Sequence, residues 1–111
     1  MEITFEPLQD KGNSSICRVF LNGKYAFNQW TFYPNRYDFK KEIRNNHLLD
    51  GYFQDKKEIK KALKELNIKD YSIEENGYAE EFWWVWIRDL DDAIKFFLKF
   101  DVDFQKNSVK V

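Results

Sequence analysis

The sequence predicts an α+β domain, a mostly antiparallel sheet of about four to five strands with about three helices packed on it. One indication is a pair of Asn-Gly dipeptides, Asn22-Gly23 and Asn76-Gly77, each lying between two apolar runs. Asn-Gly in that setting is the strongest short-range signal of a β-hairpin. The other indication is a set of amphipathic stretches with apolar residues three and four positions apart. The 111 residues have a common domain length, so we expect one domain over 1–111, with 103–111 as a tail.

The N-terminal third predicts three strands. Residues 2–6 alternate weakly and predict a short edge strand, whereas residues 7–13 are rich in turn formers and predict a loop. Residues 15–21 and 24–33 flank Asn22-Gly23 and predict the first hairpin, with Phe20 opposite Tyr25. The side chains that would share one face are Ile16, Phe20, Tyr25 and Phe27. Trp30 and Phe32 have the other parity, so we expect a bulge near Asn28-Gln29.

The middle of the chain predicts two helices. Asp38 is placed to cap a short helix through about Asn46, which would leave His47 beside C-terminal carbonyls and favour a partly charged imidazole. Residues 55–66 form the clearest predicted helix, because Asp55 stands three residues before Glu58 in a capping-box arrangement. Asn67 is the expected C-cap.

The C-terminal third predicts a second hairpin and a last helix. Strands over 69–75 and 80–87 would meet at a two-residue Asn76-Gly77 turn, which sets Ile73 opposite Glu80. Asp89 would cap a helix to about Phe100. Its expected inward residues are Leu90, Ile94, Phe97 and Leu98. Phe96 and Phe100 would then lie on its outer part, as surplus apolar surface.

The run Phe82-Trp83-Trp84-Val85-Trp86-Ile87 is the most distinctive segment. A strand turns alternate side chains to opposite faces. Phe82, Trp84 and Trp86 would line one face, and Trp83, Val85 and Ile87 the other. Both faces are apolar, so either the strand is covered on both sides or one face awaits a partner.

Composition bounds the class of protein. Hydrophobic residues make up 43% of the chain and aromatic residues 19%, enough to fill a core. No apolar stretch reaches the roughly 18 residues of a membrane span, and the first residues do not read as a signal peptide. Because Cys17 is the single cysteine, we expect a soluble protein of a reducing cytoplasm.

Patterns typical of catalysis do not stand out. Nothing in the sequence brings Cys17 and His47 together, and one Cys with one His does not make an ordinary zinc site. The Asp89-Leu90-Asp91-Asp92 cluster fits the attraction of a helix N-terminus for acids. We therefore expect no enzyme, no cofactor and no metal.

The net charge of −1 conceals a segregation. Residues 36–69 carry ten bases and six acids, whereas residues 70–103 carry ten acids and three bases. The basic part includes the lysine face of the predicted helix, Lys56 to Lys64. This face is a candidate for nucleic-acid binding, although it equally fits the solvated side of an amphipathic helix.

The acidic part suggests a binding surface. Four glutamates crowd the tip of the second predicted hairpin, next to the tryptophan strand. Tryptophans bury large areas at interfaces, and an acidic rim speeds association with a basic partner. We predict a non-enzymatic protein-binding module, an inhibitor or immunity-type protein that blocks a nuclease or defence complex. The residues predicted to bind the partner are Glu74, Glu75, Tyr78, Glu80, Glu81, Trp83, Trp84, Trp86, Asp91 and Asp92. A homodimer that covers its own apolar strand is the alternative, and a nucleic-acid binder is the second.

Overall fold

A computed structural model of the protein describes residues 1–33, 44–50, 56–75 and 83–108, with Asp50 and residues 101–108 described by their backbone alone. The strands are β1 (Ile3–Asp10), β2 (Ser14–Leu21), β3 (Lys24–Phe32), β4 (Arg44–Asp50), β5 (Tyr71–Glu75) and β6 (Trp83–Ile87). The helices are α1 (Lys56–Glu65) and α2 (Leu90–Ser108). The α+β class is confirmed. The described residues form six strands and two helices, where we expected four to five strands and about three helices.

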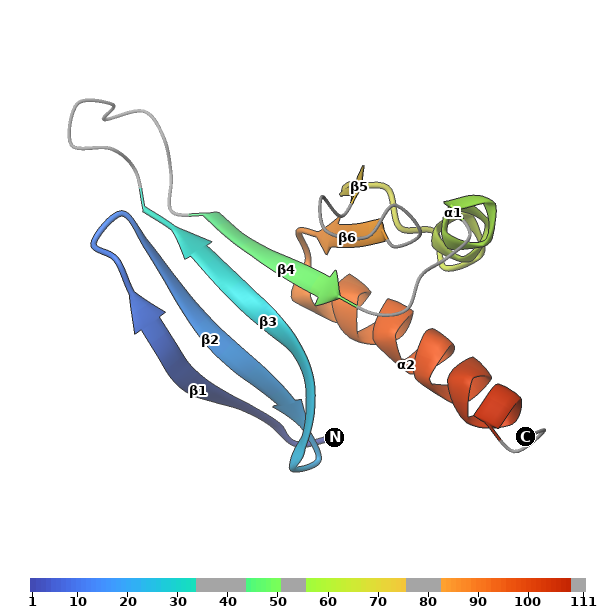
Figure 1. The fold of residues 1–111 in the computed structure, drawn as a ribbon, viewed down its shortest axis with the longest axis horizontal. Helices are drawn as coiled ribbons and strands as arrows, with labels where there is room; N and C mark the ends of the chain where they lie inside the picture. Colours follow the sequence, from blue (N-terminus) through green and yellow to red (C-terminus); the bar gives the residue numbers. More distant parts are fainter. Residues whose placement is uncertain (34–43, 51–55, 76–82, 109–111) are drawn as a thin grey trace.

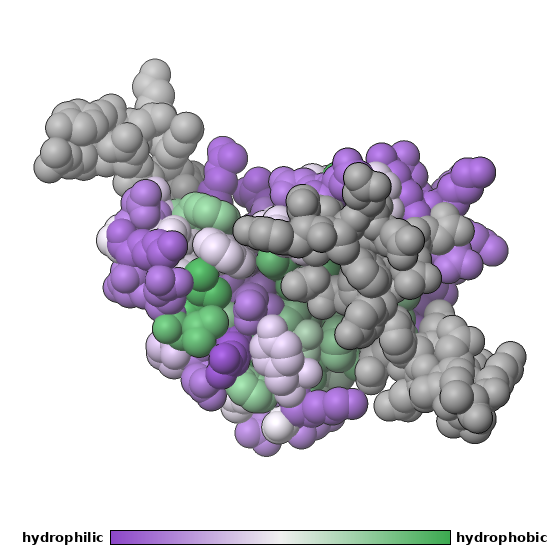
Figure 2. Space-filling model, in the orientation of Figure 1, coloured by the Kyte–Doolittle hydropathy of each residue, from purple (hydrophilic) through white to green (hydrophobic). Residues whose placement is uncertain are grey.

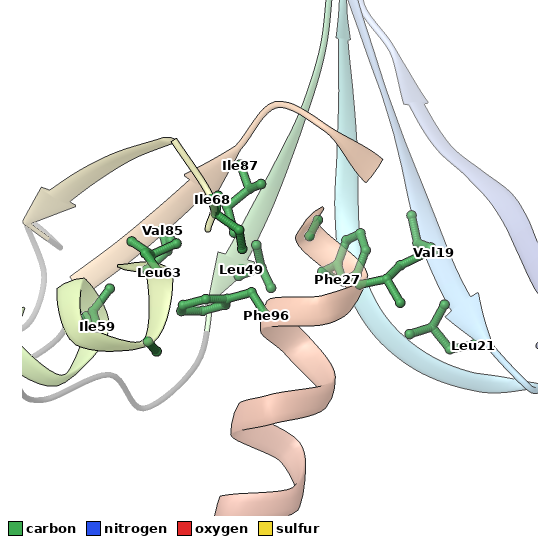
Figure 3. Close-up of a cluster of buried hydrophobic side chains, with 13 residues drawn as sticks. Val19, Leu21, Phe27, Leu49, Ile59, Leu63, Ile68, Val85, Ile87 and Phe96 are labelled. Atoms are coloured by element: carbon green, nitrogen blue, oxygen red, sulfur yellow. The ribbon is translucent and has the colours of Figure 1, made fainter. Parts of the chain in front are cut away.

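All six strands form one antiparallel sheet in the order β1-β2-β3-β4-β6-β5. Both helices pack on the same side of this sheet (Figure 1). We call that side the inner face and the opposite side the outer face. Figure 3 shows the core between the inner face and the helices, with Val19, Phe27, Leu49, Val85 and Ile87 pointing toward α1 and α2.

The first hairpin is confirmed, but its bulge lies elsewhere than expected. Asn22 and Gly23 adopt φ values of 51° and 77°, as the turn requires, and Phe20 pairs with Tyr25. The register shifts between Val19 and Phe20, so the bulge is near Ala26 and not at Asn28-Gln29. Phe27 therefore pairs with Val19 and enters the core, whereas Tyr25 stays outside.

β1 is an edge strand, as predicted, but it is longer than the sequence suggested. Residues 7–10 continue the strand where we expected a loop, with an irregularity in register between Pro7 and Gln9. Proline is tolerated there because an edge strand leaves one side without pairing.

We expected a short helix through about Asn46. The prediction is wrong for its last residues, because Arg44–Asp50 form strand β4. Residues 34–43 lie outside the described part of the chain. β4 lies between β3 and β6, and its His47 and Leu49 point into the core. Burial of these alternating side chains favours a strand over a helix. His47 consequently sits in the middle of a sheet, and not at the end of a helix.

α1 is confirmed within a residue or two, and so is its C-cap. Asn67 has a φ of 57°, Ile68 N–H donates to the Leu63 carbonyl at 2.9 Å, and Asn67 N–H donates to the Lys64 carbonyl at 3.0 Å. These bonds form a Schellman motif, and the burial of Leu63 and Ile68 in one cluster supplies its usual hydrophobic contact. The expected cap Asp55 lies outside the described residues.

The pairing of β5 with β6 is confirmed, but the predicted register is wrong. Ile73 pairs with Val85 and Glu75 with Trp83, whereas a two-residue turn would have set Ile73 opposite Glu80. The observed register places Ile73 and Val85 together on the inner face, so burial of apolar side chains decides it. Asn76-Gly77 lies outside the described residues.

α2 begins as predicted and extends further. The Asp92 N–H donates to Asp89 Oδ2 at 3.0 Å, which confirms the cap, and the helix continues to Ser108 instead of ending near Phe100. Phe96 is fully buried, so the expectation that it lies outward is wrong. Its ring reaches toward Ile59 and Leu63 of α1 (Figure 3). α2 therefore needs an apolar arc that covers both the sheet and the neighbouring helix.

Candidate functional site

The outer face of the sheet carries a series of aromatic side chains on the side opposite both described helices. Strand pairing places them on β2, β3 and β6. We call this set the aromatic strip: Phe20, Tyr25, Trp30, Phe32, Trp84 and Trp86. Tyr25 and Phe32 are 48% and 40% exposed, and the other members are partly buried. Figure 2 shows hydrophobic surface interleaved with hydrophilic surface over β1 to β3.

Four members of the strip lie on β3 and β6, and we call them the tryptophan cluster: Trp30, Phe32, Trp84 and Trp86. Trp30 stacks on Phe32 with ring centroids 6.1 Å apart, and it meets Trp86 edge-on at 6.0 Å. Because Trp30 belongs to β3 and Trp86 to β6, the two rings meet across the intervening strand β4. Ring contacts of this kind contribute about 0.5–1.5 kcal/mol beyond the area they bury.

Glu74 borders the cluster. It pairs with Trp84 across β5 and β6, and its Oε2 accepts a hydrogen bond from Trp86 Nε1 at 3.2 Å. The carboxylate is exposed, so it remains accessible beside the two indole rings.

Two indole N–H groups in the cluster have no acceptor among the described residues. They belong to Trp30 and Trp84, and both nitrogen atoms are buried. A buried donor without an acceptor costs about 1–3 kcal/mol. These two buried donors therefore lower the stability of the cluster.

The hairpin end of the strip contains a shallow, open depression of about 420 Å³ lined by Leu8, Arg18, Phe20, Tyr25 and Asn28. The Tyr25 hydroxyl donates to Asn28 Oδ1 at 3.0 Å, which holds the ring in place. Arg18 pairs with Glu6 at 3.3 Å across β1 and β2. The depression is too open to enclose a small molecule.

The structure divides the predicted binding residues into separate groups. Glu74, Trp84 and Trp86 come together on the outer face. Glu75 is exposed at the end of β5, opposite Trp83. Trp83 faces inward, where Lys56 Nζ lies 4.9 Å from its ring centroid.

The remaining predicted residues do not join this group. Asp91 and Asp92 lie in the first turn of α2, which packs on the inner face of the sheet, opposite this group. Tyr78, Glu80 and Glu81 lie outside the described residues.

A hydrogen-bonded chain on the inner face links the protein's only cysteine to its only histidine. Cys17 Sγ donates to Gln29 Oε1 at 3.5 Å, and Gln29 Nε2 lies 3.0 Å from His47 Nε2. His47 Nδ1 lies 2.9 Å from the Ile87 carbonyl oxygen, which can only accept. These partners fix the neutral tautomer with the proton on Nδ1, so His47 Nε2 accepts from the Gln29 amide.

The surroundings of this network favour the uncharged forms of His47 and Cys17. Burial lowers the pKa of His47, and the hydrogen bonds to backbone carbonyls only partly oppose that effect. Burial also raises the pKa of the Cys17 thiol. A protonated thiol is a poor nucleophile, and the lone pair of His47 is already engaged by Gln29. The sequence had no signal for this meeting, because it depends on the pairing of β3 with β4.

The described residues hold no group of three or more His, Cys, Asp or Glu side chains suited to a metal ion. Among them, neither helix is long and apolar enough to cross a membrane. Comparison of the chain with protein-family models, with curated proteins and with solved structures gave no match.

Proposed function

We propose that the protein is a non-enzymatic protein-binding module of the inhibitor or immunity type, which blocks a nuclease or defence complex through its outer face. One observation carries the proposal. The tryptophan cluster assembles from distant strands on the face that lies opposite both described helices, and Glu74 borders it.

The residue types of the strip favour a protein partner. Tryptophan and tyrosine dominate the residues that contribute most to protein–protein affinity, because they bury large areas with few rotatable bonds. The rings of Tyr25 and Phe32 are exposed although more than a dozen apolar side chains fill the core on the other face. A partner that covers the strip would bury both of these rings.

The charge at this end of the sheet favours a basic partner. Glu74 and Glu75 are adjacent and exposed on the edge strand β5. Complementary charge raises the association rate and makes binding sensitive to salt. A nucleic-acid-binding enzyme presents such a basic surface.

The test is an affinity capture from lysate of the host, at low and high salt, read by mass spectrometry. The variant combines Tyr25→Ala with Phe32→Ala, and the matched control is Phe5→Ala, which is 48% exposed like Tyr25 but pairs with the inward-facing Val19. We expect the double variant and the reversal Glu74→Lys with Glu75→Lys to abolish capture of one salt-sensitive protein, and the control to retain it. Capture that survives both changes would overturn the proposal.

Two other functions have distinct outcomes in the same experiment. Recovery of the untagged protein itself would support a homodimer joined through the strip. Recovery of nucleic acid that is released by salt would point to α1, whose Lys57, Lys60, Lys61 and Lys64 are exposed. Changing those lysines to glutamate should matter only in that case.

A further inference from the structure

We infer that Glu74 with Trp84 and Trp86 forms a recognition site for an arginine side chain of the protein partner. The inference rests on the proposed function and names the chemistry that the outer face would select. It comes from three observations on the same patch: a carboxylate with unused capacity, flanking indole rings, and local charge.

The carboxylate has room for a cation. Glu74 is exposed and accepts one hydrogen bond, from Trp86 Nε1. Among the described residues no basic side chain lies within 4 Å of it, unlike Glu6 and Glu65, which pair with Arg18 and Lys99. A carboxylate can accept about four hydrogen bonds, so Glu74 keeps most of its capacity for a partner.

The rings beside it are suited to a cation. Trp84 and Trp86 are two residues apart on β6, so they stand on one face roughly 7 Å from each other. Indole is the best cation–π surface among the side chains. Trp86 is fixed by Glu74 and by the edge of Trp30, so its position is set before a partner arrives. On the other face of the same strand, Trp83 makes a cation–π contact with Lys56, whose Nζ lies 4.9 Å from the ring centroid.

Arginine fits this arrangement better than lysine does. Its planar guanidinium can stack on an indole face while two parallel N–H groups donate to a carboxylate, and it gives up its hydration more readily than an ammonium. A single side chain can then use both the ring and the carboxylate. Neighbouring Glu75 adds negative charge at the same edge.

The test titrates the full-length protein with a blocked Gly-Arg-Gly peptide and follows the tryptophan indole N–H resonances by NMR. The reference peptide carries citrulline, which has nearly the same shape and no charge. We expect the Trp84 and Trp86 resonances to shift and the citrulline peptide to bind about tenfold more weakly. Glu74→Gln should cause a similar loss, and the control Glu75→Gln should retain most of the affinity. Equal binding of the two peptides, or an unchanged affinity of Glu74→Gln, would overturn the inference.

Failure of this inference is distinguishable from failure of the proposed function. If the arginine peptide has no effect while the Tyr25→Ala, Phe32→Ala variant still loses its captured protein, the arginine site is refuted and the binding face stands. If the peptide shifts the indole resonances but the Tyr25→Ala, Phe32→Ala variant still captures the protein, the proposed binding function is refuted.

Discussion

His47 shows how one buried side chain joins the two parts of the sheet. It is 1% exposed, donates from Nδ1 to the Ile87 carbonyl on β6, and accepts at Nε2 from Gln29 on β3. Phe27 packs against its ring at 5.7 Å between centroids. A proton added to Nε2 would face the donor group of Gln29, in a site that solvent does not reach.

The first prediction concerns pH. Burial lowers the pKa of folded His47 below its ordinary value of about 6.5, so the unfolded chain binds the proton more readily than the folded protein does. The stability from this group is therefore complete above about pH 6.5 and is lost as the pH falls toward the folded pKa, at up to about 1.4 kcal/mol per pH unit. Urea unfolding at pH 7.5 and pH 5.5 measures it.

The control for this prediction is His47→Gln, which removes the titrating group. The wild-type protein should lose more stability between the two pH values than the variant does. The account of His47 would be contradicted if both proteins showed the same dependence on pH.

At the scale of single elements, the C-terminus of α1 offers the second prediction. Asn67 holds a φ of 57°, where a residue with a β-carbon other than Asn or Asp is strained and Gly is not. Asn67→Ala should lower the free energy of unfolding by about 1 kcal/mol, whereas Asn67→Gly should leave it unchanged or raise it. Chemical denaturation of the three proteins gives the comparison, and equal losses for Ala and Gly would be inconsistent with the strain argument.

Elements with local signals were predictable from the sequence. The Asn22-Gly23 turn, the Asn67 cap and the Asp89 cap each depend on a few neighbouring residues, and the structure confirms them. β4 was not predicted, because its strand conformation depends on pairing with β3 and β6, which are distant from it in sequence. Between β3 and β6, His47 and Leu49 gain burial that a helix there would not give them.

The candidate site was only half predictable for a related reason. Alternation along β6 correctly separated Trp84 and Trp86 from Trp83. The geometry by which Trp30 and Phe32 join this site could not be found from the sequence, because it depends on the insertion of β4 between β3 and β6. The bulge near Ala26 has the same effect, since it decides which of Tyr25 and Phe27 faces outward.

At the scale of the whole molecule, the two faces of the sheet have different tasks. The inner face and both helices form the core, and the outer face carries exposed rings. The third prediction follows: Phe96→Ala should lower the free energy of unfolding by about 3–5 kcal/mol, because it empties a fully buried site. Phe32→Ala, at a ring that is 40% exposed, should change it by less than about 1 kcal/mol.

Thermal or urea unfolding of these two variants compares the contribution of a core ring, Phe96, with that of an outer-face ring, Phe32. A large loss of stability on Phe32→Ala would mean that the ring stabilises the fold and is not kept for a partner.

The most direct test of the outer face as the binding surface is site-specific photo-crosslinking in host lysate. A crosslinking amino acid replaces Phe32 on the outer face in one protein and Phe5 in the other, and the products are identified by mass spectrometry. We expect position 32 to crosslink to a single foreign protein and position 5 to give no such product. Crosslinks from position 5 alone, or crosslinks from position 32 only to another copy of this chain, would contradict that expectation.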